Sequence, residues 1–429
     1  MLPSSLGDLI NLRYLDLSWS SVKILPESLC NLCNLQTLML EGCSKLTMLP
    51  NGMYNLVNLR HLNIRGTPLK KMPKGMGKLK QLHILSNFVV GKQEDNGMED
   101  LGGLLNLHGS LEIVNLENVV DANQARNARI IDKKHIEELL LKWSSGDDMV
   151  SNTHSDEQDI LQGLQPHRVL KVLEIDGYKG TILPDWMGHS LYQNMTSVSL
   201  KSCKNCCMLP SLGQLPSLKS LCIESFDELK RIGKEFYKNE GHQHSSPIAP
   251  FPSLERLQFH NMPCCPNICR WPEGGPNICR WPEGGLPPNL KRLRVGECEE
   301  QVRGVSWLGN LDNLTRLTIS GSGSIIKSYP EVGLLPHLPS LATLHIRAFD
   351  NLETLECNEL LRLTSLQQLR ISYCEKLENM AGEKLPPSLL LLQFDSCGLL
   401  AKHCKNKHQQ IWSKISHIPT IQVDDRQIL

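Results

Sequence analysis

A few cysteines and histidines of this 429-residue chain stand at spacings that metal ligands also show. Cys30 and Cys33 form a C-x-x-C pair, which is half of a tetrahedral zinc site, but no matching second pair follows. Two further candidates are the adjacent pairs Cys206–Cys207 and Cys264–Cys265, and adjacent cysteines are poorly placed to bind one metal ion together. The last is a group in a lysine-rich segment that we interpret as a solvated helix face: His403, Cys404 and His408. The sequence therefore predicts no metal site.

Phosphate binding and catalysis find equally little support. Gly75-Met76-Gly77-Lys78 resembles part of a phosphate-binding loop, but Leu79 replaces the hydroxyl residue that would reach magnesium. No G-x-S-x-G or H-E-x-x-H motif is present. We therefore expect no enzymatic activity, no catalytic residues and no cofactor in this chain.

The elements that would position any site are set by a repeat. Residues 34–62 hold one period: Leu35, Leu38 and Leu40 read L-x-x-L-x-L, Cys43 follows three residues later, and a new L-x-x-L begins at Leu59. This is the leucine-rich repeat, in which each period contributes one strand and one return segment to a solenoid.

The repeat covers nearly the whole chain. Fifteen starts are recognisable, most of them 23 to 29 residues apart: Leu12, Leu35, Leu59, Leu82, Leu111, Ile136, Leu170, Met195, Leu218, Leu254, Leu290, Leu314, Leu341, Leu366 and Leu389. We therefore expect one leucine-rich-repeat domain over 1–423 and a C-terminal tail over 424–429. Inserted loops or helices are expected near 87–103, 121–134, 144–159, 233–250 and 264–287.

The predicted fold is an α/β, right-handed leucine-rich-repeat solenoid shaped as a horseshoe or arc. A parallel β-sheet should line its concave face, with irregular or short helical return segments outside. The fourth repeat position should point inward in every strand, as at Leu15, Leu38 and Leu62. Asp121 is expected to cap a helix whose alanines form one face.

Composition bounds the partners. Lys and Arg number 45, as do Asp and Glu, so no global field points to nucleic acid. No apolar run is long enough for a membrane span, and the first residues lack the pattern of a signal peptide. Five cysteines occupy one inward repeat position, an arrangement that suits a reducing compartment: Cys43, Cys203, Cys298, Cys374 and Cys397.

Longer motifs narrow the class. LPESLCNLCNLQTLML, NLVNLRHLNI, MPKGMGKLKQL and NFVVGK are followed in order by LENVVDANQAR, IEELLLKW, LQGLQPHRVLKVLEIDGYKG and LPSLGQLPSLKSLCI. Over residues 2–423 the chain closely resembles the repeat region of plant intracellular disease-resistance receptors with coiled-coil, nucleotide-binding and leucine-rich-repeat parts. The coiled coil and the nucleotide-binding module are not in this sequence, so we interpret it as a fragment, a truncated product or a repeat-only relative.

The resemblance implies a function. In such receptors the repeats recognise a pathogen effector or a guarded host protein, and they hold the nucleotide-binding module inactive in the plant immune response. ADP or ATP would bind only to that module. A cytoplasmic or nuclear location is implied, with no nucleic acid or membrane span involved.

Three other functions remain open. A cell-surface ectodomain is disfavoured because the sequence shows no signal peptide, span or L-x-G-x-I-P pattern. An F-box-type substrate adaptor also fits: no F-box precedes the repeats in this sequence, but truncation would remove one. A solenoid enzyme inhibitor fits the same repeats.

The hypothetical binding site is the concave face of five repeats. In those starting at 254, 290, 314, 341 and 366, six of fifteen outward positions are arginine and none is acidic. The candidate residues are Arg256, His260, Arg292, Arg294, Arg316, His345, Arg347 and Arg370. We expect the arginines to form one stripe that binds an acidic surface. The alternative is that their stems merely cover leucine edges.

One segment departs from the repeat. PNICRWPEGG at 266–275 recurs unchanged at 276–285, and removal of one copy restores a normal repeat length. We expect one copy to loop out of the solenoid.

Overall fold

The computed structural model describes residues 2–92, 97–144, 154–230, 250–262, 287–296, 311–331, 335–406, 408–424 and 426–429, together with Asp95, Ile232, 234–237 and Gly333. The chain forms two compact units, Met1–Cys206 (unit 1) and Cys207–Leu429 (unit 2). The duplicated decapeptide, the 264–286 part of the expected insertion and Cys298 lie outside the described residues.

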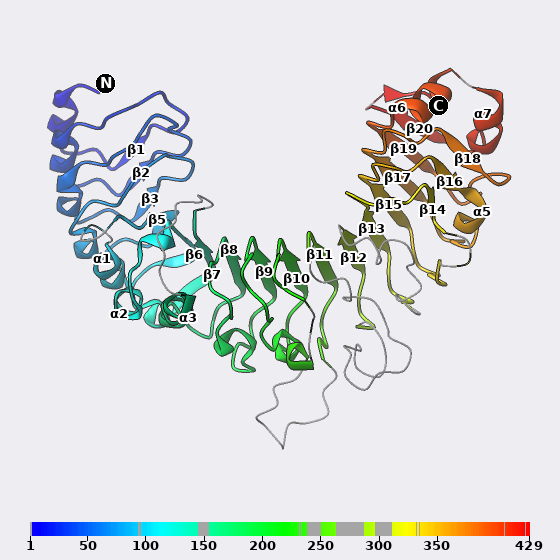
Figure 1. Ribbon diagram of the computed structural model, residues 1–429. Coiled ribbons are helices and arrows are strands. Elements are labelled where there is room, and N and C mark those ends of the chain that lie inside the picture. Colours follow the sequence, from blue (N-terminus) through cyan, green and yellow to red (C-terminus); the bar gives the residue numbers. More distant parts are fainter. Residues whose placement is uncertain are drawn as a thin grey trace. The chain divides into compact units, whose positions relative to one another are not determined.

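Unit 1 is a stack of coils whose strands pair in parallel (Figure 1). Its four N-terminal strands form one sheet: β1 (Tyr14–Asp16), β2 (Thr37–Met39), β3 (His61–Asn63) and β4 (Ile84–Leu85). The next five follow in chain order in a second ladder: β5 (Asn87–Val89), β6 (His108–Val114), β7 (His135–Lys142), β8 (Val172–Asp176) and β9 (Ser197–Lys201).

Return segments in the first coils are 3-10 turns that begin after proline. Pro3, Pro26 and Pro50 immediately precede η1 (Ser4–Asp8), η2 (Glu27–Asn31) and η3 (Asn51–Asn55). Proline fixes φ near −65°, the value needed there, and its missing N–H leaves no donor unsatisfied. The Leu-Pro pair that precedes each of these turns thus directs the chain away from the strands. The later 3-10 turns are η4 (Met76–Lys78), η6 (Leu116–Asn118), η7 (Ile130–Asp132), η8 (Asp185–Gly188), η9 (Leu212–Gln214) and η10 (Lys234–Phe236).

Ser86 separates the two ladders of unit 1. Its hydroxyl accepts the Ile64 N–H at 2.9 Å and donates to the Asn87 side-chain oxygen at 2.7 Å. After this interruption, β5 pairs with β6 so that Asn87 lies opposite Glu112 and Phe88 opposite Ile113. Phe88 is fully buried. The segment 87–103, expected as an insertion, therefore begins as a strand and ends as helix α1 (Met98–Gly103).

The helices of unit 1 pack through small residues. Asp121 caps α2 (Ala122–Asn127) as predicted, accepting the Asn123 and Gln124 N–H groups at 2.8 and 2.9 Å. Its alanine face receives α3 (His154–Gly163), since a Cβ at Gly163 would lie 2.9 Å from the Ala125 Cβ. The expected loop over 144–159 therefore ends inside a helix.

A buried lysine closes helix α1. The Lys133 ammonium nitrogen donates to the carbonyl oxygens of Leu101 and Leu104, each at 2.7 Å, and the residue is fully buried. The Leu101 carbonyl also accepts the Leu104 N–H at 3.0 Å, and Lys133 adds a second donor to it and one to the Leu104 carbonyl at the end of the helix. Burial, followed by the nearby Arg129 charge, lowers the pKa of Lys133 to about 7.

Unit 2 continues the same plan. Its main sheet runs, in spatial order, from β10 (Ser220–Glu224) through β11 (Arg256–His260), β12 (Arg292–Gly296), β13 (Arg316–Ser320), β15 (Thr343–Arg347), β17 (Gln368–Ser372) and β19 (Leu391–Asp395) to β20 (Thr420–Val423). Helices α6 (Gly398–Lys405) and α7 (Gln409–Ile415) lie between β19 and β20 in the chain. The expected tail instead turns back, and β21 (Arg426–Gln427) pairs antiparallel with β20.

A second, smaller sheet lies on the return side of unit 2 (Figure 1). It consists of the parallel strands β14 (Ser328–Tyr329), β16 (Thr354–Glu356) and β18 (Asn379–Ala381), with the short helix α5 (Cys357–Leu360) after β16. Three successive coils are therefore hydrogen-bonded on both sides. The sequence did not predict these return strands.

The inward positions are those expected from the repeat. Leu15 and nine other leucines hold the fourth repeat position. The nine others are at most 2% exposed: Leu38, Leu62, Leu173, Leu221, Leu257, Leu293, Leu317, Leu344 and Leu369. Leu15 is half-buried because its strand has a described neighbour on only one side. One start was misplaced: Leu111 pairs with Leu139, so it holds the fourth position rather than the first.

Polar side chains join successive coils at both ends of the strands. Asn34, Asn58 and Asn106 donate their amides to carbonyl oxygens of the preceding coil at 2.8 to 2.9 Å. At the strand exit, the Cys43 and Cys397 thiols donate to the Leu17 and Ile371 carbonyl oxygens at 3.0 and 3.4 Å. The inward cysteine position is thus confirmed where it is described, and it satisfies backbone groups at the turn.

Leu38→Asp should abolish the packing of its coil. An uncompensated charge among leucines costs about 3 kcal/mol or more, so the free energy of unfolding should fall by that amount. Thr37→Asp, one residue earlier on the outward side, is the matched control and should change it by less than about 1 kcal/mol. Chemical denaturation measures both; equal effects would contradict the inward assignment.

Lys133→Met tests the buried amine. The unfolded chain keeps the ordinary lysine pKa of about 10.4, so between pH 7 and 9 it binds one proton more than the folded protein. Parental stability should therefore rise over that window by about 2 kcal/mol more than that of the variant. Denaturant titrations at pH 7, 8 and 9 provide the comparison, and parallel pH profiles would show that Lys133 stays charged when folded.

Candidate binding face

The outward side chains of the main sheet of unit 2, here named the strand face, fall into three rows. Strand register aligns them across neighbouring coils. Row 1 contains Ser220, Arg256, Arg292, Arg316, Thr343, Gln368 and Leu391; row 2 contains Cys222, Gln258, Arg294, Thr318, His345, Arg370 and Gln393; row 3 contains Glu224, His260, Gly296, Ser320, Arg347, Ser372 and Asp395.

Row 1 places three arginines side by side. Arg256 pairs in register with Arg292, which pairs with Arg316, and all three are exposed. Neighbouring strands lie about 4.8 Å apart, so like charges at this spacing repel. Arg294 in row 2 lies on the same strand as Arg292 and extends this group.

The remaining candidates form a second group. His345 pairs with Arg370 in row 2, and Arg347 lies on the His345 strand in row 3. Thr318 and Thr343 stand between the two groups. The single arginine stripe expected from the sequence is therefore two clusters, and His260 lies apart from both in row 3, at the last residue of β11.

The outward cations of unit 1 are arranged differently. Lys142 forms an ion pair with Glu112 at 2.7 Å, and Lys201 with Glu174 at 3.1 Å. Within the described part of the chain, by contrast, none of the six strand-face arginines forms an ion pair. These two outward lysines of unit 1 are paired with carboxylates, whereas the strand-face arginines of unit 2 are in no ion pair among the described residues.

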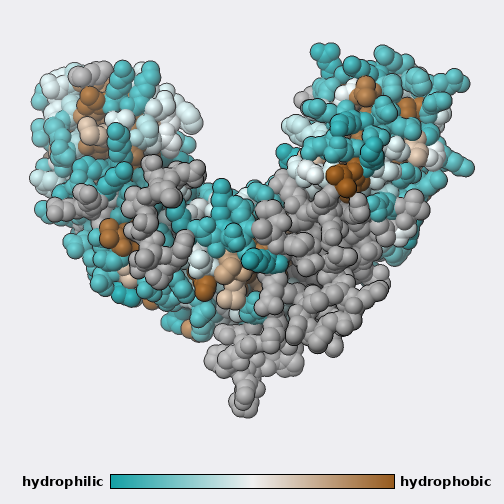
Figure 2. Space-filling model, in the orientation of Figure 1, coloured by the Kyte–Doolittle hydropathy of each residue, from teal (hydrophilic) through white to brown (hydrophobic). Residues whose placement is uncertain are grey.

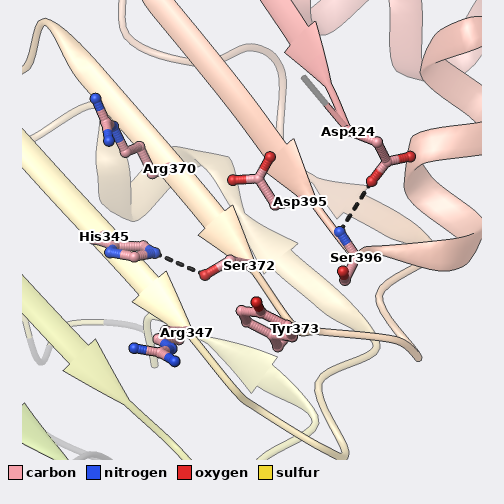
Figure 3. Close-up of a pocket in the computed structure, with 8 residues that line it drawn as sticks. All are labelled: His345, Arg347, Arg370, Ser372, Tyr373, Asp395, Ser396 and Asp424. Carbon is pink, nitrogen blue, oxygen red and sulfur yellow. Dashed lines mark hydrogen bonds between the residues drawn. The ribbon is translucent and has the colours of Figure 1, made fainter. Parts of the chain in front are cut away.

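A pocket of about 550 Å³ lies at the C-terminal part of the strand face (Figure 3). Its cationic wall comes from β15 and β17, where the Arg347 guanidinium lies 5.4 Å from the centre of the Tyr373 ring. The His345 Nε2 atom lies 2.7 Å from the Ser372 hydroxyl oxygen. The opposite wall carries Asp395 and Asp424.

Burial shifts the pKa of His345, and hydrogen bonds shift that of Asp424. Burial, together with Arg347 and Arg370, lowers the pKa of His345, so the imidazole is neutral at pH 7. The Lys405 ammonium, 3.0 Å from Asp424, and the Ser396 N–H, at 3.1 Å, lower the pKa of the Asp424 carboxyl. The pocket thus holds two guanidinium groups and two carboxylates, one of which is paired with a lysine.

The sequence reasoning missed Tyr373, Ser396 and Asp424 because they lie just beyond the L-x-x-L-x-L positions. Each has a positive φ, at 55°, 53° and 48°, as do Ser202, Ser225 and Ala348 at other strand exits. This left-handed residue turns the chain out of the sheet. A count continued past the last leucine would have placed these side chains beside row 3.

The other chemical candidates have structural surroundings. Cys30 is buried and Cys33 exposed, and no group of three metal-ligand side chains occurs among the described residues. In the loop that resembles a phosphate site, the Gly75 and Gly77 N–H groups donate to Asp100 at 2.8 and 3.1 Å. Lys78 lies 4.8 Å from the Tyr54 ring centre, so this segment is an ordinary return turn.

The described surface is mainly hydrophilic in one view. Figure 2 shows mainly hydrophilic side chains over the described surface in that view, with isolated hydrophobic residues between them. No helix in the described ranges combines the length and apolar character that a bilayer crossing needs.

Comparison with known proteins finds relatives of this chain. Residues 98–226 match the family model of the R13L1/DRL21 leucine-rich repeats. A putative disease resistance protein of Arabidopsis thaliana is 47% identical over 277 residues, covering 63% of this chain and 19% of that protein. The putative disease resistance RPP13-like protein 1 of the same plant is 35% identical over 428 residues, covering 93% of this chain and 40% of the relative. The chain is a leucine-rich-repeat region of the plant disease-resistance class.

These disease-resistance repeats span less than half the length of the two relatives. A leucine-rich-repeat protein of Leptospira interrogans is similar over 99% of this chain and 98% of its own, at 18% identity and a TM-score of 0.43. The repeat class agrees with a binding domain rather than a catalytic one.

Removal of one outward cation should have opposite effects in the two units. Arg292→Gln relieves repulsion and should raise the free energy of unfolding by about 0.3 kcal/mol at low ionic strength, whereas Lys142→Gln breaks an ion pair and should lower it. Both effects should vanish in 1 M salt, where the Debye length is about 3 Å. Destabilisation by Arg292→Gln at low salt would show that its charge is already neutralised.

Proposed function

We propose that this chain is the ligand-recognition part of an intracellular plant immune receptor, and that the arginine group of β11–β13 docks an acidic protein surface. The observation that carries the proposal is the row of Arg256, Arg292 and Arg316, which are adjacent, exposed and without ion pairs among the described residues. A partner that supplies carboxylates would remove their mutual repulsion, and planar guanidinium groups bind carboxylates through two hydrogen bonds.

Two kinds of partner fit this surface. One is a pathogen effector or a guarded host protein, and the other is the receptor's own nucleotide-binding module, which the repeats would hold inactive. Nucleotide would bind to that module and not here, since Asp100 already receives the Gly75 and Gly77 amides. Cytoplasmic or nuclear location follows from this role.

The relatives favour an immune receptor over an F-box-type substrate adaptor. The two relatives described above, of whose length this chain covers 19% and 40%, are named as disease-resistance proteins. The alternative that the arginines only cover leucine edges predicts that their charge can be reversed without consequence, which makes it testable with the same variants.

The test reverses the row 1 charges in a complete receptor. Arg256, Arg292 and Arg316 are changed to Glu in a receptor that joins this chain to the coiled-coil and nucleotide-binding parts of a related disease-resistance protein. We expect either cell death without a pathogen, from loss of autoinhibition, or loss of response to an effector that the parent recognises. Leaf expression followed by ion-leakage measurement reports both outcomes.

The matched control makes the same charge change outside the strand face. Lys230, Lys384 and Lys402 are exposed and lie away from the three rows, so their replacement by Glu should leave both responses at the parental level. Thermal unfolding must show that both triple variants are folded. A folded row 1 variant that behaves as the parent in both assays would refute the docking role.

A further inference from the structure

The pocket of Figure 3 differs from the arginine row because it combines both signs of charge. Along row 3 the side chains change from Arg347 on β15, through Ser372 on β17, to Asp395 on β19. Asp424 follows β20 and extends the acidic wall. Two strand spacings, about 10 Å, separate the strand of Arg347 from that of Asp395, and Arg370 lies on the strand between them.

The cationic wall is held ready for a carboxylate. The Arg347 guanidinium lies over the Tyr373 ring, 5.4 Å from its centre, a cation–π contact that holds it at this wall. Arg370 is exposed on the neighbouring strand. His345 is neutral and engaged with Ser372, so it adds polarity but no charge to this wall.

The acidic wall is open to a cation. The Asp395 carboxylate oxygens accept only from the neutral Gln393 amide, at 3.0 and 3.3 Å, among the described residues. Asp424 is already engaged by Lys405 and by the Ser396 N–H. Asp395 is therefore the carboxylate whose charge is available to a ligand.

Size and charge together restrict the ligand. A volume of about 550 Å³ falls in the usual range for small-ligand pockets of about 300 to 1,000 Å³. A purely anionic ligand would meet Asp395, a purely cationic one would meet Arg347 and Arg370, and an apolar one would leave all of these groups desolvated without partners. A ligand with both charges satisfies each wall.

We propose that this pocket binds a short polypeptide segment of a partner protein in which an acidic and a basic side chain lie about three residues apart. Three residues of extended chain span about 10 Å, which matches the distance between the walls. The acidic side chain would contact Arg347 and Arg370, and the basic one Asp395. This inference rests on the proposed protein-recognition function and defines the orientation in which a partner docks.

Short synthetic peptides test the pocket directly. The probes are acetyl-Glu-Gly-Gly-Lys-amide and two singly charged controls, in which Gln replaces either Glu or Lys. Saturation-transfer difference NMR on the full chain measures dissociation constants in the millimolar range. We expect the doubly charged peptide to bind at least fivefold more tightly than either control.

Variants assign the two walls. Arg347→Gln should reduce binding of the doubly charged peptide to the level of the base-only control, and Asp395→Asn to the level of the acid-only control. Lys384→Gln and Asp312→Asn remove exposed charges of the same signs elsewhere in unit 2 and should leave peptide binding unchanged.

The outcomes separate this inference from the proposed function. Acid-only binding as tight as that of the doubly charged peptide would make the pocket a plain anion site and overturn the inference. Failure of all three peptides to bind at 10 mM, or binding that survives both pocket variants, would overturn it as well. None of these results depends on the row 1 arginines, whose docking role is tested separately in the complete receptor.

Discussion

Each coil of this chain can bury its leucines only against the coils on either side. Leu38, between two strands, is fully buried, whereas Leu15, with one described neighbour, is half-buried although it holds the same repeat position. Because the core is built by contacts between neighbouring coils, the register between adjacent strands determines which side chains stack inward and which stack outward. The same register that stacks Leu257, Leu293 and Leu317 inward stacks Arg256, Arg292 and Arg316 outward. Core and candidate binding face are therefore two consequences of one alignment.

Much of this fold was predictable because the repeat fixes which side of a strand each residue occupies. The inward leucines, the prolines before the 3-10 turns and the Asp121 cap all follow from local rules. The departures occur where the pattern is ambiguous. Leu111 looked like a first position because Val114 and Leu116 follow it at the spacing of the fourth and sixth positions, and only pairing with Leu139 shows its true place. The break at Ser86 depends on a side-chain hydroxyl replacing a backbone acceptor, and the return strands β14, β16 and β18 are too short to signal themselves.

The candidate site was predictable in part for the same reason. Its strand residues could be named because they alternate with leucines. Their grouping could not, since lateral neighbours depend on how coils of unequal length align. The pocket needed one more element, the left-handed residue after each strand, which brings Tyr373 and Ser396 beside Arg347 and Asp395. Backbone conformation at the strand exit, rather than repeat spacing, completes this part of the surface.

The small sheet on the return side of unit 2 has a consequence for how the pocket can recognise anything. Strands β13, β15 and β17 belong to the same coils as β14, β16 and β18, so the coils beneath the cationic wall are clamped by hydrogen bonds at both ends. Such coils resist shear and cannot change the spacing of their outward side chains cheaply. A preorganised surface loses little entropy on association, but it also cannot adapt to a mismatched ligand. If the pocket binds as proposed, discrimination there would reside in a rigid arrangement of charges, and new specificity would arise by exchanging side chains on it rather than by remodelling the backbone.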